Sequence, residues 1–277
     1  MESSSTEDAE AGEPGTESVD VGDLTIAFCA TGSGPPLLLL HGGFSDHRAW
    51  SRQVDELADE FTVIAWDAPG CGGSDDPPEG FGLEGYADCL AELVELLDLD
   101  RPHVLGLSFG GGLAIALHAR HPEIPRSLVL ASAYAGWAGS LPAPEVVDRL
   151  ERAERDAHRP PVEWVGDYLP TLFGPAATDE AIADTRSMML DTRPAGMLEM
   201  LRAFAEADLR DALPRIDVPT LLLYGDADVR SPRHVAEGLY EQIPDADLVV
   251  IDGVGHCLHL EAPERFESEV RGFLARV

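Results

Sequence analysis

Short, largely apolar runs alternate along the chain with longer segments in which apolar residues recur at helical spacing. The runs cover residues 35–40, 61–66, 103–105, 127–131, 219–224 and 247–251. An apolar run without polar alternation is typical of a strand buried on both faces, as strands of a parallel sheet are. Regular alternation of strand and helix therefore predicts an α/β fold with a doubly wound, mostly parallel sheet.

Amphipathic segments between these runs predict the helices. They cover residues 49–58, 83–97, 233–242 and 263–275. The second of them shows the pattern well, since Leu90, Leu93 and Val94 lie on one face of a helix. A weaker signal near the start predicts a hairpin over residues 21–30, with residues 24–28 as its clearer strand.

The alternation stops at residues 134–208, which have helical propensity, many Arg, Glu, Pro and Met residues, and no clear strand. Such a block between two strands predicts a helical cap inserted into an α/β core of residues 21–133 and 209–277. Residues 1–20 contain seven acidic residues, no basic residue and many Ser, Gly and Thr. This composition predicts a disordered acidic tail.

A Gly-x-Ser-x-Gly turn at residues 106–110 follows the apolar run 103–105 and precedes a small-residue helix. This is the context of a nucleophile elbow, in which a sharp turn holds the serine in a strained conformation. The N–H of Phe109, at the helix N-terminus, is a candidate donor to an oxyanion. Because the Ser108 hydroxyl needs a base before it can attack, the hypothesis requires a histidine and an acid elsewhere. The alternative is a Gly-rich turn with an incidental serine.

Acidic residues and a histidine follow two later strands. In a doubly wound sheet, ligands bind beyond the carboxyl ends of the strands. Asp226 and Asp228 follow the run 219–224, and His256 follows the run 247–251. The order Ser, Asp, His is the one expected of a nucleophile elbow on this architecture. The Gly-x-x-Asp spacing favours Asp228 as the acid, and Asp226 is the alternative.

Four motifs in this order resemble those of the α/β-hydrolase family. They are the His-Gly turn at 41–44, the elbow at 106–110, the Gly-x-x-Asp turn at 225–228 and the histidine turn at 255–263. The resemblance covers nearly everything from residue 21 onward. It implies that Ser108 is the nucleophile, that His256 is the general base, and that Asp228 orients the histidine.

The resemblance also implies an oxyanion hole. Its donors would be the backbone N–H groups of Gly43 and Phe109, with Phe44 as a weaker alternative to Gly43. Serine at the elbow argues against a dehalogenase or an epoxide hydrolase, which have aspartate there on this fold. Together with the implied triad, the serine favours a carboxylesterase-like hydrolase that cleaves small to medium acyl substrates through an acyl-enzyme.

Two other functions stay open at this stage. One is a hydrolase of a carbon–carbon bond or an enol-lactone in aromatic degradation, and the other is a non-catalytic ligand receptor on the same fold. No cofactor is expected. No metal is expected either, because no His, Cys and Asp cluster has the spacing of metal ligands.

The cap and the terminal turn supply residues for a substrate pocket. The candidates are Trp137, Trp164, Met188, Met197 and His259. Methionine and aromatic side chains suit an adaptable apolar pocket. The alternative for each of them is a packing role between the cap and the core.

The charge of the chain is its most unusual feature. The chain has 51 Asp and Glu residues against 19 Arg and no Lys, a formal net charge of −32. Such a surface repels nucleic acid and anionic membranes, which excludes both as partners. Its self-repulsion is screened in molar salt, where the Debye length is about 3 Å. The composition therefore predicts a halophilic protein, and the alternative is an acidic protein from a low-salt cell.

Cellular location follows from three further features. No apolar run approaches the roughly 20 residues that span a bilayer, and the N-terminus lacks the basic and apolar regions of a signal peptide. The four cysteines form no Cys-x-x-Cys pair, which is typical of free thiols in a reducing compartment. These features predict a cytoplasmic protein. We further expect a monomer or homodimer, with a small-molecule substrate as its partner.

Overall fold

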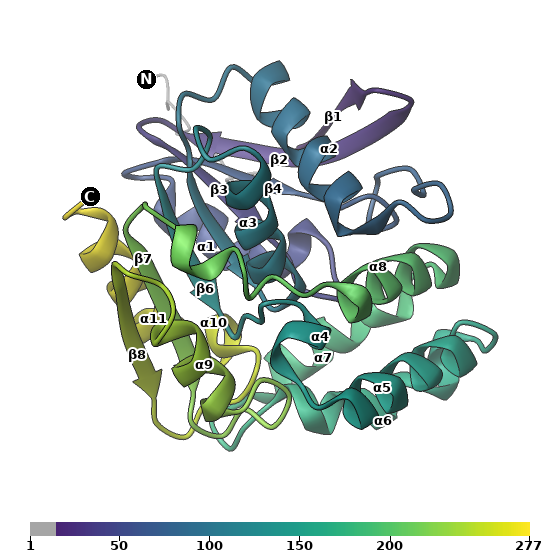
Figure 1. Ribbon diagram of the computed structural model, residues 1–277. Helices are drawn as coiled ribbons and strands as arrows, with labels where there is room; N and C mark the ends of the chain where they lie inside the picture. Colours follow the sequence, from purple (N-terminus) through teal and green to yellow (C-terminus); the bar gives the residue numbers. More distant parts are fainter. Residues whose placement is uncertain (1–14) are drawn as a thin grey trace, which may run out of the picture.

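One eight-stranded sheet runs through the molecule (Figure 1). The computed structural model describes residues 15–277. The strands are β1 (Thr16–Val21), β2 (Leu24–Gly32), β3 (Pro36–Leu40), β4 (Thr62–Trp66), β5 (His103–Leu107), β6 (Ser127–Ala131), β7 (Thr220–Gly225) and β8 (Ala246–Ile251). Their order across the sheet is β1-β2-β4-β3-β5-β6-β7-β8. The pairings β1–β2 and β2–β4 are antiparallel and all others are parallel, which confirms the predicted fold class.

Helices cover both faces of this sheet, with α2, α3 and α9 on one face and α1 and α11 on the other. The α-helices are α1 (Ser51–Leu57), α2 (Gly82–Leu96), α3 (Phe109–Arg120), α4 (Trp137–Ser140), α5 (Ala143–Asp156), α6 (Val165–Leu172), α7 (Asp179–Leu190), α8 (Pro194–Glu206), α9 (Arg233–Tyr240), α10 (Leu258–Glu261) and α11 (Pro263–Leu274). Short 3₁₀ helices are η1 (His47–Trp50), η2 (Pro161–Glu163) and η3 (Leu213–Arg215). Within residues 15–277, no helix has both the length and the apolar character needed to cross a bilayer.

The central strands are apolar throughout because each face meets a layer of helices. In β3, Leu38 and Leu40 join the cluster formed with α2 and α3, whereas Leu37 and Leu39 join the cluster formed with α1 and α11. Strand β8 is less buried than the central strands, since most of its side chains are only half-buried. It lies at the edge of the sheet, where one neighbouring strand is missing.

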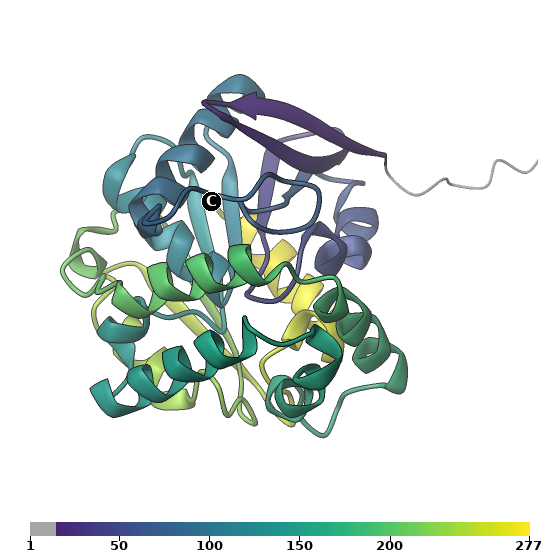
Figure 2. The same ribbon diagram turned by 90° about the vertical axis from the view of Figure 1, so that its right-hand side faces the viewer.

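Helices α4 to α8 lie between β6 and β7 in the sequence, where a cap was predicted. The described chain has no strand between Ala131 and Thr220. The five helices gather beside the sheet, at lower right in Figure 1, and α5 and α8 run side by side in front of the strands in Figure 2. Helix α8 also packs against α2, so the cap rests directly on the core.

The start of the fold corrects one predicted boundary. Residues 16–20, assigned above to a disordered tail, belong to strand β1, which pairs with β2 from Thr16 opposite Cys29 to Val21 opposite Leu24. Most of β1 is exposed, so its sequence lacks the apolar pattern that reveals a strand. The rest of the predicted tail, residues 1–14, lies outside the described residues.

Candidate active site

Ser108 occupies the sharp turn between β5 and α3. Its backbone has φ 54° and ψ −108°, a conformation that L-residues rarely adopt. The flanking glycines are required by close backbone contacts. A Cβ on Gly106 would lie 2.2 Å from the Gly110 oxygen, and a Cβ on Gly110 would lie 2.2 Å from the Leu40 oxygen. The turn is therefore packed so tightly that only glycine fits on either side of the serine.

Asp228 and His256 form a buried pair. His256 Nδ1 lies 2.8 Å from Asp228 Oδ2, while Asp228 Oδ1 accepts the backbone N–H groups of Arg230 at 2.8 Å and Ser231 at 2.9 Å. Burial acts to raise the pKa of the Asp228 carboxyl, but His256 and these hydrogen bonds outweigh it and hold the pKa below its usual range. An ionised carboxylate only accepts, so Nδ1 of His256 is the donor in this bond and Nε2 is the ring nitrogen left to act on Ser108.

The two acids left open by the sequence have different positions. Asp226 Oδ1 accepts the backbone N–H of Gly253 at 2.6 Å and so braces two loops against each other. Only Asp228 bonds to the His256 ring among the described residues. The structure therefore brings Asp228, and not Asp226, to the histidine.

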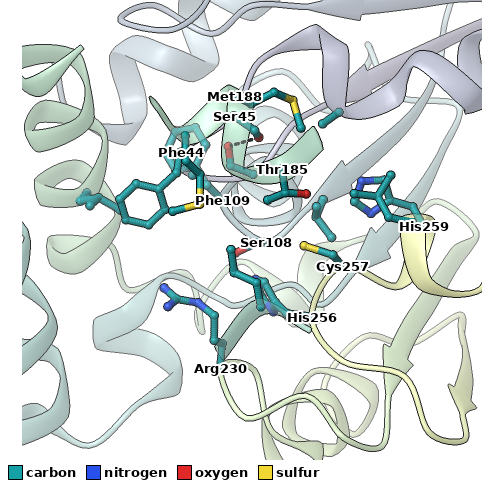
Figure 3. Close-up of a pocket in the computed structure, with 18 of the residues that line it drawn as sticks. Phe44, Ser45, Ser108, Phe109, Thr185, Met188, Arg230, His256, Cys257 and His259 are labelled. Atoms are coloured by element: carbon teal, nitrogen blue, oxygen red, sulfur yellow. Dashed lines mark hydrogen bonds between the residues drawn. The ribbon is translucent and has the colours of Figure 1, made fainter. Parts of the chain in front are cut away.

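Ser108 and His256 line one cavity between the end of the sheet and the cap, and Figure 3 shows their side chains next to each other. No hydrogen bond in residues 15–277 joins Ser108 Oγ to the His256 ring. In sites without substrate such bonds are often long and tighten on binding. Trp137, Met188 and His259, which the sequence suggested for the pocket, line this cavity as well.

Two other suggested pocket residues lie elsewhere. Trp164 packs its buried ring against Phe44, with centroids 5.7 Å apart, and against Tyr168, with centroids 5.5 Å apart. Met197 faces a separate cavity near Cys71. Both side chains therefore help to hold the cap on the core. The sequence could not show this, because the packing of the cap helices decides which of their apolar residues reach the cavity.

Three backbone N–H groups are available at the same cavity. They belong to Gly43, Phe44 and Phe109, all of which line it. No hydrogen bond to these groups occurs among the described residues, and Phe109 is the first residue of α3, where N–H groups have no partner within the helix. Phe44 also has a positive φ of 64°, which marks a second strained turn beside Ser108.

Several lining residues were not predicted. Thr185 lines the cavity, and its buried hydroxyl has no hydrogen-bond partner in residues 15–277. Beside it, the predicted pocket residue His259 also has two ring nitrogens without a partner in the described chain. Burial lowers the pKa of His259 to about 3, so its ring is neutral at ordinary pH. Arg230 also lines the cavity. The only sequence signal for Arg230 was its place two residues after the acid turn, and Thr185 had none.

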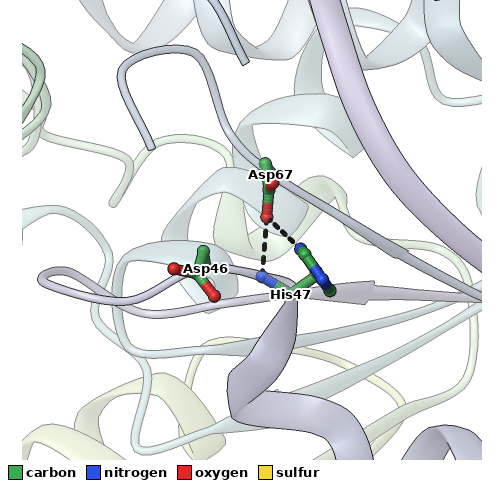
Figure 4. Close-up of side chains that lie close together, drawn as sticks. All are labelled: Asp46, His47 and Asp67. Carbon is green, nitrogen blue, oxygen red and sulfur yellow. Dashed lines mark hydrogen bonds and ion pairs between the residues drawn. The ribbon is translucent and has the colours of Figure 1, made fainter. Parts of the chain in front are cut away.

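One group of side chains has the spacing of metal ligands. Within residues 15–277, atoms of Asp46, His47 and Asp67 lie within 4.8 Å of one another (Figure 4). Both Asp46 oxygens accept from Arg48, and Asp67 accepts from the backbone and ring of His47 and from the Gly73 N–H. These bonds occupy the oxygens that a metal would need. The cluster instead clasps the loops that follow β3 and β4.

Comparison with known proteins agrees with the fold. The chain matches the model described as alpha/beta hydrolase fold over residues 35–263. It is 30% identical over 268 residues to a pimeloyl-(acyl-carrier protein) methyl ester esterase of Aeromonas hydrophila, across 91% of this chain and 100% of the relative. A solved thermophilic esterase from Thermogutta terrifontis has a TM-score of 0.87 and 32% identity, across 95% of this chain and 98% of that one.

An enol-lactonase from Burkholderia xenovorans is similar too, with a TM-score of 0.83 and 25% identity across 94% of this chain and 100% of the other. In each of these three comparisons at least nine-tenths of both chains align, so the likeness concerns the whole fold and not one motif. The family model spans the segments that carry Ser108, Asp228 and His256. The chain belongs to the alpha/beta hydrolase fold family.

Proposed function

We propose that the protein is a serine hydrolase that cleaves carboxylic esters of small to medium acyl groups through an acyl-enzyme. One observation carries the proposal: the strained Ser108 turn and His256, which Asp228 holds from behind, meet at a single cavity. The name of the Aeromonas relative and of the Thermogutta structure, both esterases, supports the ester as substrate class.

The reaction follows from the hydrogen bond between Asp228 and His256 and from the place of Ser108 at the same cavity. His256 Nε2 takes the Ser108 hydroxyl proton as the oxygen attacks the ester carbonyl, and Asp228 stabilises the imidazolium that forms. The same proton then goes to the leaving alcohol, which yields the acyl-enzyme. A water molecule repeats the sequence, giving its proton to His256 as it attacks, and releases the acid and free Ser108.

Charge on the carbonyl oxygen is stabilised by the free backbone N–H groups. Phe109 supplies one donor and Gly43 or Phe44 the other, each contributing roughly 10²–10³ to the rate. The nearby helix N-terminus adds its positive dipole end. Since the turn is fixed by backbone contacts, these donors need little rearrangement as the oxyanion develops.

A cyclic enol-ester is the second candidate substrate, because the enol-lactonase of Burkholderia xenovorans shares this fold over nearly the whole chain. The same three residues would open the ring, and the leaving enolate would stay in the product. A panel of simple esters and enol-lactones at equal concentration separates the two candidate functions. An esterase should show the higher kcat/KM for the simple esters, and an enol-lactonase the higher kcat/KM for the enol-lactones.

The decisive test is a fluorophosphonate probe, which reacts with an activated serine. We expect one labelled peptide, containing Ser108, and a burst of p-nitrophenol from a short-chain p-nitrophenyl ester. Ser108→Ala is expected to lose both the label and the burst. A folded wild-type protein that stays unlabelled and releases no p-nitrophenol would identify a non-catalytic receptor instead.

A further inference from the structure

The cavity around Ser108 carries an unusual charge for this chain. Its one side chain with a fixed charge is Arg230, and a second cavity that shares Arg230 with it is lined also by Arg149 and Arg152. Among residues 15–277, no Asp or Glu lines either cavity. In a protein with 51 acidic residues and 19 basic ones, a site with arginines and without carboxylates is positively charged against the surrounding surface.

Arg230 has hydrogen-bond donors to spare. Within the described chain its guanidinium donates one hydrogen bond, from Nη1 to Thr171 Oγ1 at 3.2 Å, and makes no ion pair. The nearest acid of the site, Asp228, uses its oxygens for His256 and for backbone N–H groups. Burial lowers the pKa of Arg230, and the charge of Arg149 acts in the same direction, whereas Asp228 acts to raise it.

The neighbouring arginines reinforce this charge. The Arg152 and Arg230 guanidinium groups lie 5.2 Å and 5.9 Å from the centroid of the Tyr168 ring. Arg149 donates to the Arg230 carbonyl oxygen at 2.8 Å and pairs with Glu145, which does not line the cavity. Two of the three arginines thus have no carboxylate partner in the part of the chain that the structure describes.

Position connects this charge with the chemistry. Figure 3 shows Arg230 beside Ser108 and His256, on the side of the cavity away from His259. A guanidinium is planar and presents parallel N–H groups that match the two oxygens of a carboxylate. A purely structural arginine in so acidic a chain would be expected to pair with one of its many carboxylates.

We propose that Arg230 forms a carboxylate subsite and that the substrates are esters which carry a second, ionised carboxylate. This inference rests on the proposed ester hydrolysis and narrows its substrate class. The carboxylate can belong to the acyl part, as in a half-ester of a dicarboxylic acid, or to the alcohol part, as in an acylated hydroxy acid. Arg149 and Arg152 add attraction at the same end of the site.

The kinetic test compares esters that differ only in charge. The acyl arm uses monomethyl succinate against methyl succinamate, and the alcohol arm uses acetoxyacetate against acetoxyacetamide. We expect kcat/KM for the anion to exceed that for the amide in one arm by roughly 10- to 100-fold, as for a charged hydrogen-bonded pair. Arg230→Met should remove this preference, and Arg230→Lys, which keeps the charge and the fold, should retain part of it.

The matched control is Arg155→Met, which removes the same charge from an exposed cap position outside both cavities. It should leave the anion-to-amide ratio unchanged. A wild-type enzyme that hydrolyses both members of each pair equally well would overturn the subsite while leaving ester hydrolysis in place. The same conclusion would follow if Arg230→Met, shown to be folded, kept the preference.

A binding measurement tests the subsite without turnover. Levulinate, the methyl ketone analogue of monomethyl succinate, is titrated calorimetrically against levulinamide into the wild type, Arg230→Met and Arg155→Met. Tighter binding of levulinate that is lost only in Arg230→Met supports the subsite even if no ester is cleaved. Equal binding of the two compounds to the wild type contradicts it.

Discussion

Ser108 shows how backbone strain is kept at one residue. A non-glycine residue at positive φ costs on the order of 1–3 kcal/mol, which the surroundings must offset. The backbone N–H of Ser108 donates to the carbonyl oxygen of Ala131 at 2.8 Å. The carbonyl oxygen of Ser108 accepts from the backbone N–H of Gly112 at 3.1 Å. Neighbouring strand and helix thus hold the turn from both sides, and the hydroxyl faces the cavity without having to rearrange.

The glycines of this turn give a direct test of its packing. Gly110→Ala is expected to destabilise the protein by about 1–3 kcal/mol or to prevent folding, because its Cβ would meet the Leu40 backbone. Gly272→Ala is the control, since no atom lies within 4 Å of its Cβ and alanine favours a helix by up to about 1 kcal/mol. Urea unfolding midpoints should move in opposite directions. Equal midpoints for the two variants would show that the turn can relax.

The acid of the site can be identified by a pair of amide variants. Asp228→Asn is expected to lower kcat about 10⁴-fold for a simple ester, because an amide favours the wrong ring tautomer of His256. Asp226→Asn should change kcat little, since within residues 15–277 the one hydrogen bond of the Asp226 side chain goes to the Gly253 N–H and none goes to His256. Circular dichroism confirms that both variants fold. A larger loss in Asp226→Asn would contradict the assignment of Asp228.

Hydrogen bonds join the last turn of cap helix α6 to the loop that carries His256. The backbone N–H groups of His256 and Cys257 both donate to the Leu172 oxygen at 3.0 Å, at the end of α6. The Glu261 carboxylate accepts the N–H groups of Gly174 at 2.7 Å and Gly255 at 3.0 Å. A cap movement therefore also moves the backbone beside the catalytic base.

Glu261→Gln tests this connection. A glutamine keeps one acceptor oxygen, so one of the two N–H groups loses its partner at a cost of about 1–3 kcal/mol. We expect a lower unfolding midpoint and a several-fold lower kcat, because His256 is held less firmly. Glu264→Gln, at an exposed position of α11, is the control and should shift both quantities far less. If the two variants behave alike, the link between cap and loop does not position the base.

The central elements could be predicted because each follows from a local pattern. Strands β3 to β7 are apolar on both faces, and in the helices around them apolar residues recur at helical spacing. Strand β1 could not be recognised, since it lies at the sheet edge and Val19 and Val21 are its only apolar residues, too few to show a clear alternation. Edge position is decided by strand order, which the sequence of one strand does not contain.

The site likewise has a part that the sequence could predict and a part that it could not. Ser108, Asp228 and His256 each follow a strand end in a short motif, so the sheet itself brings them together. The cap part of the lining depends on how α7 and α8 are rotated against the core. This explains why Met188 lines the cavity while Met197 does not, and why Thr185 was missed.

The charge of the whole molecule affects its stability in two opposite ways. Net charge of −32 disfavours the compact state through self-repulsion. Ion pairs hold the cap to the core, including Arg48 with Asp191 at 3.0 Å and Arg193 with Asp76 at 2.8 Å. Exposed pairs of this kind contribute about 0–1 kcal/mol each. Salt weakens both the repulsion and the ion pairs, so the change in stability on adding salt shows which of the two is larger.

Repulsion among so many carboxylates extends over the whole surface, whereas each ion pair is local, and we expect repulsion to dominate. The Debye length falls from about 30 Å at 0.01 M salt to about 3 Å at 1 M. The urea midpoint should therefore rise steadily as potassium chloride is added to molar concentration; urea is used because guanidinium would itself screen the charges. A parallel series near pH 4.3, the isoelectric point at which the net charge is close to zero, should show a smaller gain. A midpoint that stays constant or falls with salt at neutral pH would refute adaptation to a salt-rich cytoplasm.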